Sequence, residues 1–427
     1  MDPMTTIDLN QIAERVDRAA QRLEGIAAVT PLQHNVRLSA LTGAEVWLKR
    51  EDLQPVRSYK LRGAYTLMSQ LDAAARANGV VCASAGNHGQ GVAWSCARLG
   101  IVGQVFVPTT TPRQKRERIM ELGQGQVRLI TVGDSYDEAA EAARACVSGS
   151  GGTLVPAFDH LDTLSGQGTV APEILNQLGA APDVVLVPVG GGGLLAGAGA
   201  WLRAHAPRAR LVGVEPAGAA CLAAARAAGQ PVALPELDTF VDGAAVRRAG
   251  DLTWEVVRQL DCELTTVAEG QICSEMLALY QTDGIIAEPA GALASAALRL
   301  GAHDRTVSVR PGQTVVVFVS GGNNDISRYS EVLERSLVHE GRKHYFLVSF
   351  PQEPGQLRRF LDRILGPDDD VVLFEYTKKS NRETGPALVG IELGDPNDLP
   401  ALLARAAASP IKVEPISPDS SFYRYLV

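Results

Sequence analysis

The sequence lacks any long apolar segment and any concentration of basic residues. No apolar run approaches the ~18 residues that a membrane-spanning helix needs, and the polar N-terminus has no signal-peptide pattern. The 40 Lys and Arg residues are scattered along the 427 residues, and the formal net charge is -8. This charge pattern excludes a broad basic surface for nucleic acid. We expect a cytoplasmic protein that binds neither membranes nor nucleic acid.

Cysteine is scarce, and its spacing shows no metal or disulfide pattern. The six cysteines include no C-x-x-C pair and no Cys/His ligand spacing, so neither a zinc site nor a disulfide framework is expected. We interpret them as reduced core residues: Cys82, Cys96, Cys146, Cys221, Cys262 and Cys273.

What the chain does have is length and an alternating pattern. At 427 residues it exceeds the size at which one hydrophobic core usually stops growing, so at least two domains are expected. From about Val46 onward, apolar runs alternate with amphipathic stretches, which is typical of a parallel, doubly wound α/β sheet. The expected strands cover residues 46–50, 80–84, 102–107, 127–132, 184–189, 210–214 and 314–319.

Two helix starts are marked by their flanking residues. Thr111-Pro112 predicts a capped start for a helix that ends at Gly123. Ser58 is the predicted cap of another helix, which would run toward residue 70. This second prediction places Lys60 in the first turn of a helix.

The pattern changes after about Ser336 and predicts a separate small domain. Its elements follow the order βαββαβ, which is the ferredoxin-like signature. The charged stretch Glu331–Lys343 contains the expected linker, residues 336–343. The expected elements are a strand at 344–350, a helix at 354–365, strands at 370–378 and 386–393, a helix at 397–408 and a strand at 411–416.

Three polar or glycine-rich loops directly follow expected strands. They cover residues 84–89 (SAGNHG), 190–193 (GGGG) and 320–323 (SGGN). In open α/β sheets, ligands bind beyond the carboxyl ends of the strands. We therefore expect the three loops to line one pocket.

The four consecutive glycines predict a phosphate site. They join a buried strand to an apolar helix, so their N–H groups are free of side chains beside the positive end of a helix dipole. The stretch has neither the Gly-Lys-Ser/Thr of a Walker loop nor the G-x-G-x-x-G spacing of a dinucleotide site. A purely conformational turn is the alternative.

Lys60 is the candidate nucleophile. In the first turn of a helix, the dipole and the neighbouring Arg62 both disfavour a charged ammonium group. A lysine with a lowered pKa can form a Schiff base with an aldehyde. The alternative is a solvated helix lysine, and the three loops argue against it.

These residues together resemble a known family. The motifs are Ser58-Tyr59-Lys60-Leu61-Arg62-Gly63-Ala64, ASAGNHGQG (83–91), GQGT (166–169), GGGG (190–193), EPAGA (288–292) and SGGN (320–323). The order of the motifs resembles that of the fold-type II pyridoxal-phosphate enzymes, specifically the threonine ammonia-lyases (threonine dehydratases). The resemblance runs through nearly the whole chain. It implies a tryptophan synthase beta-like catalytic domain at residues 1–335, with doubly wound parallel sheets in two subdomains and the small subdomain inserted at about 57–156.

The resemblance also implies a role for each motif. Lys60 would hold pyridoxal 5'-phosphate as a Schiff base and act as the base at the substrate Cα. Ser320 would face the pyridine nitrogen, where a hydroxyl does not keep that nitrogen protonated and so favours elimination over transamination. Asn87 would bond the ring hydroxyl, Gly190, Gly191, Gly192, Gly193 and Leu194 would hold the phosphate, and Ser84, Gly86 and His88 would surround the substrate carboxylate.

The implied reaction converts L-threonine to 2-oxobutanoate and ammonia, the first step of isoleucine biosynthesis, with L-serine as a second substrate. A degradative serine/threonine dehydratase and a serine racemase are alternatives. Metal-dependent relatives carry a third acid after an E-P motif, whereas Glu215-Pro216 is followed here by Ala219, Ala220 and Cys221, so we predict no divalent metal. A non-catalytic amino-acid sensor is the alternative from another class, and an intact Lys60 argues against it.

The last ~85 residues resemble the ACT-like regulatory domain of the biosynthetic branch, at residues 344–427. The resemblance rests on Pro354-Gly355-Gln356-Leu357, Phe374-Glu375-Tyr376 and Asn381-Arg382-Glu383. It implies isoleucine, with valine as a second candidate, as effector. A single copy would pair with a neighbouring subunit's copy, and the family suggests a homo-oligomer, a tetramer. A dimerisation module without ligand is the alternative.

Overall fold

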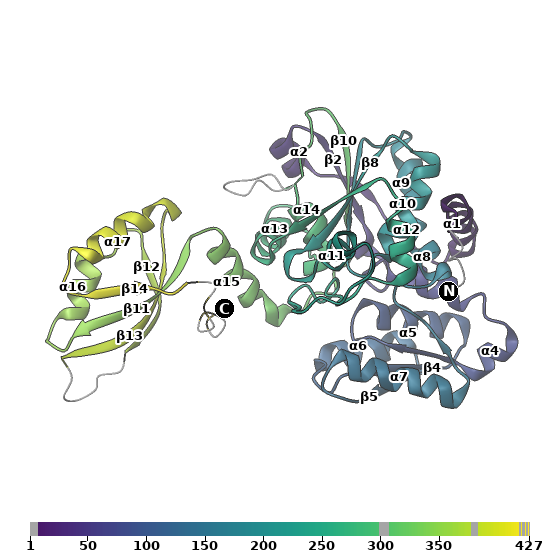
Figure 1. Cartoon of the computed structure of the whole chain (residues 1–427), viewed down its shortest axis with the longest axis horizontal. Helices are drawn as coiled ribbons and strands as arrows, with labels where there is room; N and C mark the ends of the chain where they lie inside the picture. The colour runs from purple at the N-terminus through teal and green to yellow at the C-terminus, as the bar shows by residue number, and fades with distance from the viewer. Residues whose placement is uncertain are drawn as a thin grey trace. The chain divides into compact units, whose positions relative to one another are not determined.

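The computed structural model describes residues 7–298, 307–376 and 383–417, together with residues 420, 423 and 426. The chain forms two compact units, Met1–Asp325 and Ile326–Val427 (Figure 1). This division precedes the boundary at residue 335 that the sequence suggests. In the described parts, no helix is long and apolar enough to cross a membrane.

The larger sheet of the first unit has six strands in the order β1-β2-β10-β7-β8-β9. Strand β1 is antiparallel to β2, and the other neighbours are parallel, as the prediction of a parallel sheet requires. The strands are β1 (Leu32–His34), β2 (Glu45–Arg50), β7 (Val184–Pro188), β8 (Arg210–Pro216), β9 (Cys262–Val267) and β10 (Thr314–Val319). The predicted strands β2, β7, β8 and β10 are confirmed. Strands β1 and β9 lie at the two edges, where no continuous apolar run is needed, and the sequence did not predict them.

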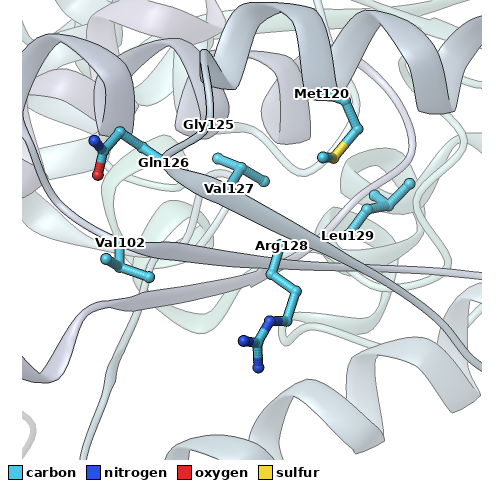
Figure 2. Close-up of a pocket in the computed structure, with 7 residues that line it drawn as sticks. All are labelled: Val102, Met120, Gly125, Gln126, Val127, Arg128 and Leu129. Atoms are coloured by element: carbon cyan, nitrogen blue, oxygen red, sulfur yellow. The ribbon is translucent and has the colours of Figure 1, made fainter.

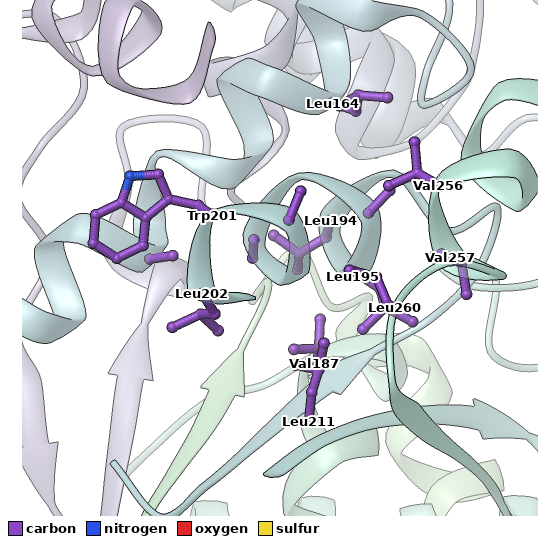
Figure 3. Close-up of a cluster of buried hydrophobic side chains, with 14 of the residues drawn as sticks. Leu164, Val187, Leu194, Leu195, Trp201, Leu202, Leu211, Val256, Val257 and Leu260 are labelled. Carbon is purple, nitrogen blue, oxygen red and sulfur yellow. The ribbon is translucent and has the colours of Figure 1, made fainter. Parts of the chain in front are cut away.

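Helices cover both faces of this sheet (Figure 1). Strand β7 and helix α10 contribute to the main core (Figure 3), which includes Val187, Leu194, Leu195 and Trp201. A strand buried along its whole length, such as β7, is typical of a parallel sheet with helices on both sides. The helices of this layer are α1 (Leu9–Leu23), α2 (Val36–Thr42), α8 (Leu161–Gly168), α9 (Val170–Leu178), α10 (Gly193–His205), α11 (Cys221–Ala228), α12 (Asp251–Val257), α13 (Glu269–Gln281) and α14 (Pro289–Ala296).

The smaller sheet of the first unit is fully parallel, in the order β5-β4-β3-β6. Its strands and helices fall in the segment 57–156 that the resemblance implies as an inserted subdomain. The two-residue strand β6 was not predicted. The elements are α3 (Lys60–Met68), α4 (Ala73–Asn78), β3 (Val80–Ala83), α5 (Asn87–Leu99), β4 (Gly103–Val107), α6 (Arg113–Gly123), β5 (Val127–Thr131), α7 (Tyr136–Ser150) and β6 (Thr153–Leu154).

Both predicted helix caps are wrong. Helix α3 begins at Lys60 after Tyr59 without a side-chain cap, because Ser58 instead forms a bridge to Gly321 next to β10. Helix α6 begins at Arg113, because Pro112 has an extended ψ of 143° and is itself the N-cap residue. The predicted end of α6 at residue 123 is confirmed.

The second unit confirms the predicted βαββαβ order. Its antiparallel sheet has the order β12-β13-β11-β14, and α16 and α17 close a core that contains Phe346, Phe360 and Val389. Helix α15 (Tyr329–His339) occupies much of the charged stretch in which the linker was expected. The elements are β11 (Lys343–Pro351), α16 (Gln356–Arg363), β12 (Asp370–Tyr376), β13 (Thr384–Glu392), α17 (Leu399–Ala407) and β14 (Lys412–Pro415).

Candidate active site

Lys60 is the first residue of α3, and short contacts connect it to all three loops. The Tyr59 N–H donates to the Ser320 carbonyl at 3.2 Å, which joins the lysine to loop 320–323. Gly91, in the helix after loop 84–89, lies so close that an added Cβ would be 3.1 Å from the Lys60 carbonyl carbon. The Lys60 Nζ donates to the Ala157 carbonyl at 3.0 Å, and the next residue, Phe158, packs on the glycine loop. The structure thus brings the three loops together around one amine.

The Lys60 amine is in the state that Schiff-base chemistry requires. Burial lowers the pKa of Lys60 to about 8, and the carboxyl group of Glu288 opposes this shift. A large fraction of the amine is therefore neutral near pH 8. The lowered pKa agrees with the sequence interpretation, but the cause is burial rather than the charge of Arg62.

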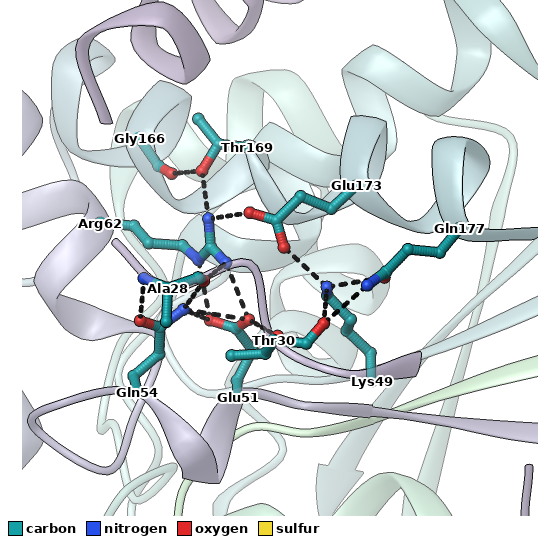
Figure 4. A network of polar contacts seen from close by, with 10 residues as sticks. All are labelled: Ala28, Thr30, Lys49, Glu51, Gln54, Arg62, Gly166, Thr169, Glu173 and Gln177. Carbon is teal, nitrogen blue, oxygen red and sulfur yellow. Dashed lines mark hydrogen bonds and ion pairs between the residues drawn. The ribbon is translucent and has the colours of Figure 1, made fainter. Parts of the chain in front are cut away.

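Arg62 is not among the groups that shift the pKa of Lys60, and its own charge is paired in a buried network (Figure 4). Its guanidinium donates to Glu51 at 2.8 and 2.9 Å and to Glu173 at 2.7 Å. Lys49 Nζ donates to the second oxygen of Glu173 at 2.6 Å. Burial alone would lower the pKa of Arg62, but these carboxylates raise it above its ordinary value. The network joins α3 to β2 and α9.

The glycine loop Gly190–Gly193 has its carbonyls engaged and its N–H groups free. The Gly191 carbonyl accepts from Thr253 Oγ1 at 2.7 Å. Within the described residues, no carbonyl or side chain accepts a hydrogen bond from the N–H groups of Gly190, Gly191 or Gly192. These groups lie at the N-terminus of α10, where the helix dipole favours an anion.

Glycine is required at these positions. A Cβ on Gly191 would lie 2.5 Å from the ring of Phe158, and a Cβ on Gly190 would lie 2.9 Å from the backbone of Ala244. Gly192 has a φ of +91°, which L side chains rarely adopt. The four glycines therefore form a tight turn and at the same time an anion cradle. The two interpretations from the sequence, a phosphate site and a conformational turn, are compatible with each other.

Asn87, the first residue of α5, is held from two sides. Its Nδ2 donates to Glu288 Oε1 at 2.5 Å, and its Oδ1 accepts from Asn323 Nδ2 at 2.6 Å. Burial raises the pKa of Glu288 to about 7, and the charge of Asp242 adds to the shift. The amide of Asn87 is thus fixed at the point where loops 84–89 and 320–323 meet.

Ser320 directly follows β10 and is buried. Its Oγ donates to the Ala290 carbonyl at 3.1 Å, and a hydroxyl can turn to another acceptor by rotation about one bond. The role at a pyridine nitrogen stays a prediction.

The residues Ser84 to Gly86 form a compact turn directly before α5. The Gly86 N–H donates to Ser84 Oγ at 3.2 Å, and the first turn of α5 leaves the N–H groups of Asn87 and His88 without intrahelical acceptors. Such N–H groups suit a carboxylate.

The ring of His88 is buried. Its Nε2 donates to the Val155 carbonyl at 2.7 Å, and burial, with the charge of Lys60, lowers the pKa of His88 to about 4. The ring is therefore neutral, and its buried Nδ1 has no hydrogen-bond partner among the described residues, so His88 offers this acceptor as well as its backbone N–H.

Two site residues were not assigned a role from the sequence. Glu288 lies in the EPAGA motif and contacts Asn87, while Gln167 lies in the GQGT motif and donates to the Ala157 carbonyl at 2.9 Å. The motifs marked both segments, but the sequence contains no signal that the Glu288 carboxyl group contacts Asn87 or that the Gln167 amide shares the Ala157 carbonyl with Lys60.

Glu215 has a structural task in this fold. Its two oxygens accept from the N–H groups of Leu222 and Ala223 at 2.7 and 2.9 Å, and burial raises its pKa to about 7. In the described chain, no group of three His, Cys, Asp or Glu side chains is arranged to hold a metal ion. The expected absence of a divalent metal stays a prediction.

A surface pocket of about 530 Å³ lies elsewhere, at the edge strand β5 of the smaller sheet (Figure 2). Its lining residues include Val102, Met120 and Arg128, and none belongs to the candidate site. In the second unit, Asn381 and Arg382 of the expected effector motif lie outside the described residues, and Glu383 precedes β13.

Comparisons with known proteins agree with this geometry. Residues 23–321 match the family described as "Pyridoxal-phosphate dependent enzyme", and residues 334–426 match the "C-terminal regulatory domain of Threonine dehydratase". The chain is 58% identical over 414 residues to "L-threonine dehydratase biosynthetic IlvA" of Mycobacterium tuberculosis, covering 96% of this chain and 95% of that one. It is 46% identical over 410 residues to the protein of the same name from Bacillus subtilis, covering 96% of each.

Solved structures are similar to about three quarters of the chain. The processed form of threonine deaminase isoform 2 from Solanum lycopersicum has a TM-score of 0.72 and 36% identity, and the match covers 77% of this chain and 93% of that one. Maize serine racemase has a TM-score of 0.70 and 29% identity, with coverage of 78% and 99%.

Proposed function

The chain belongs to the pyridoxal-phosphate dependent enzymes and, within them, to the biosynthetic threonine dehydratases, and from this premise we propose that Lys60 carries the elimination of water and ammonia from L-threonine. The product is 2-oxobutanoate. The observation that supports this site is the buried amine of Lys60, with a pKa of about 8, at the meeting point of three loops.

The residues of the site fit pyridoxal phosphate. In the cradle Gly190–Gly193, the N–H groups of Gly190, Gly191 and Gly192 have no acceptor among the described residues, and the glycines carry no side chains of their own, which suits a phosphate. We assign Leu194 to the same site through its N–H in the first turn of α10. Asn87 suits the ring hydroxyl, and Ser320 suits the ring nitrogen.

The bound cofactor would supply an electron-withdrawing ring that acidifies the substrate Cα–H. Lys60 Nζ removes the proton from Cα, because a buried amine with a pKa near 8 can be neutral and basic at the working pH. The first turn of α5, after Ser84 and Gly86, receives the substrate carboxylate on backbone N–H groups. The neutral ring of His88 keeps an additional positive charge out of this site.

A metal-free elimination is supported by Glu215. Relatives that bind a divalent cation carry their site near this E-P motif, but here both carboxylate oxygens cap α11. We therefore favour the dehydratase over a serine racemase and over a degradative serine/threonine dehydratase, with L-serine as a second substrate. The buried amine of Lys60 argues against a non-catalytic sensor.

The second unit is proposed to bind the feedback effector. Its family match is a regulatory domain, and its open βαββαβ sheet suits pairing with another copy in a homotetramer. We assign isoleucine as the effector and valine as a second one. A cytoplasmic location is supported by six free cysteines, the state that thiols keep in a reducing compartment.

The test is the rate of 2-oxobutanoate formation from L-threonine by the cofactor-loaded protein while isoleucine is titrated. If 2-oxobutanoate forms and isoleucine suppresses its formation, the result supports catalysis by the first unit and effector binding by the second. Production that isoleucine does not change retains the chemistry and rejects the effector assignment, and an absence of 2-oxobutanoate rejects the substrate.

A further inference from the structure

Two side chains donate to the same main-chain carbonyl beside the candidate nucleophile. Lys60 Nζ donates to the Ala157 oxygen at 3.0 Å, and Gln167 Nε2 donates to it at 2.9 Å. A carbonyl oxygen has two lone pairs, so these two donors together saturate it. With one lone pair taken by Gln167, the other gives the Lys60 amine a single defined direction.

The Ala157 carbonyl is part of a rigid segment. The preceding Val155 N–H donates to Val81 at 2.9 Å, which fixes the segment to the smaller sheet. Two residues later, the Asp159 carboxylate accepts from the N–H groups of Asp251 and Thr253, both at 3.1 Å, at the start of α12. These hydrogen bonds hold the Ala157 carbonyl in place. The hydrogen bond from Lys60 therefore forms only where the Lys60 amine reaches this fixed oxygen.

Gln167 is fully buried, and one end of its amide is unpaired. Its Oε1 has no hydrogen-bond partner among the residues that the structure describes. A buried unpaired amide oxygen costs about 1–3 kcal/mol, so its retention at this place calls for a reason.

The position of the unpaired Gln167 oxygen gives a reason for its retention. A Cβ on Gly193 would lie 2.4 Å from Gln167 Oε1, so the amide extends from Ala157 to the first residue of α10. Its acceptor end lies at the positive end of that helix, and its donor end lies at a carbonyl. The reversed orientation would place two acceptors against each other at Ala157.

We propose that Gln167 is a positioning residue that fixes the Ala157 carbonyl as the resting place of the Lys60 amine whenever that amine is released from the cofactor. This inference rests on the proposed function. When the amine returns, its lone pair would form the bond to the cofactor carbon, and the amino-acid nitrogen would leave with the electrons of its own bond. The proton that Nζ loses passes to the departing nitrogen. An amine held at one place returns faster than one that samples many orientations.

The test follows exchange of Lys60 with L-alanine, which has no β-leaving group and so is not turned over by elimination. Stopped-flow absorbance of the loaded full-length protein gives the rate at which L-alanine displaces the lysine and the rate of the lysine's return. In Gln167→Met, the return should slow about tenfold, the factor that corresponds to one hydrogen bond, while displacement changes less.

The chain offers a matched control. Gln177 Nε2 donates to the Thr30 carbonyl at 2.9 Å, and Lys49 Nζ donates to the same oxygen at 2.7 Å, so the arrangement is repeated away from the loops. Gln177→Met should leave both exchange rates at the wild-type values. An equal loss in both variants would indicate a general effect on the fold and overturn the proposal.

A second variant guards against misfolding. Gln167→Asn keeps an amide but shortens its reach by one methylene, so it should also slow the return. A folded Gln167→Asn or Gln167→Met protein with wild-type return rates overturns the inference. If the wild-type protein itself forms no 2-oxobutanoate from L-threonine, the proposed function fails instead.

Discussion

Asn87 Nδ2 donates a 2.5 Å hydrogen bond to the buried carboxyl group of Glu288, across more than two hundred residues of sequence. The bond joins α5 of the smaller sheet's layer to the start of α14. It explains how an asparagine assigned to the cofactor ring is held in one orientation.

Glu288 should make stability depend on pH. Its pKa is raised from 4.5 to about 7 in the folded chain, so the folded state binds more protons than the unfolded state between these values. Stability from this group is therefore lost as the pH rises through that window, by at most about 3 kcal/mol. In Glu288→Gln, urea unfolding at pH 5 and pH 7.5 should show a smaller loss than in the wild type. An identical loss in both proteins would show that Glu288 is already ionised at pH 5.

Lys60→Ala should keep the fold and remove both the visible absorbance of bound cofactor and 2-oxobutanoate formation. The reason is that Lys60 is the lysine on which the three loops converge. Lys115→Ala, in the same subdomain, is the control and should retain the absorbance. Turnover at the wild-type rate in Lys60→Ala would refute the site.

Gly191→Ala should weaken both stability and cofactor binding. The new methyl group would overlap the Phe158 ring, and overpacking of this kind costs about 1–3 kcal/mol. Gly149, in α7, has no atom within 4 Å of an added Cβ, so Gly149→Ala is the control and should not be destabilised. Urea unfolding and a titration with pyridoxal phosphate measure the two effects.

Arg62→Ala should be severely destabilising, because it leaves Glu51 and Glu173 without their buried partner. Such a loss is expected to cost about 3–5 kcal/mol. Arg113 pairs with Glu117 on the surface, and Arg113→Ala should leave the unfolding midpoint nearly unchanged, because water screens an exposed pair. Similar unfolding midpoints for the two variants would contradict the importance of the network.

Removal of the second unit should preserve turnover and abolish isoleucine inhibition. A chain ending at Asp325 should be more stable than one ending at Ser336. The reason is that Glu334 of α15 accepts a hydrogen bond from Tyr345 of β11 at 2.6 Å, so α15 belongs with the second unit. Inhibition that persists in either truncated protein would place the effector site in the first unit.

The sequence predicts the parts of this molecule that depend on local pattern. Continuous apolar runs located β2, β7, β8 and β10, and glycine runs located the cradle. Edge strands such as β9 mix polar and apolar residues, so no periodic signal marks them. The caps at Ser58 and Thr111 failed because partners distant in sequence, or the backbone of Pro112, determine the local geometry.

The electrostatics of the site could not be read from sequence neighbours. Arg62 lies two residues from Lys60, yet its charge is directed to Glu51 and Glu173. The group that acts on Lys60 is Glu288, which only the fold brings near.

The anchoring of α3 has a mechanical consequence. Ser58 bridges to Gly321, and Arg62 is bound to Glu51 and Glu173, so both sides of Lys60 are fastened to the larger sheet's layer. Lys60 belongs to the segment that forms the smaller sheet, yet it is thus held in place by residues of the larger sheet's layer.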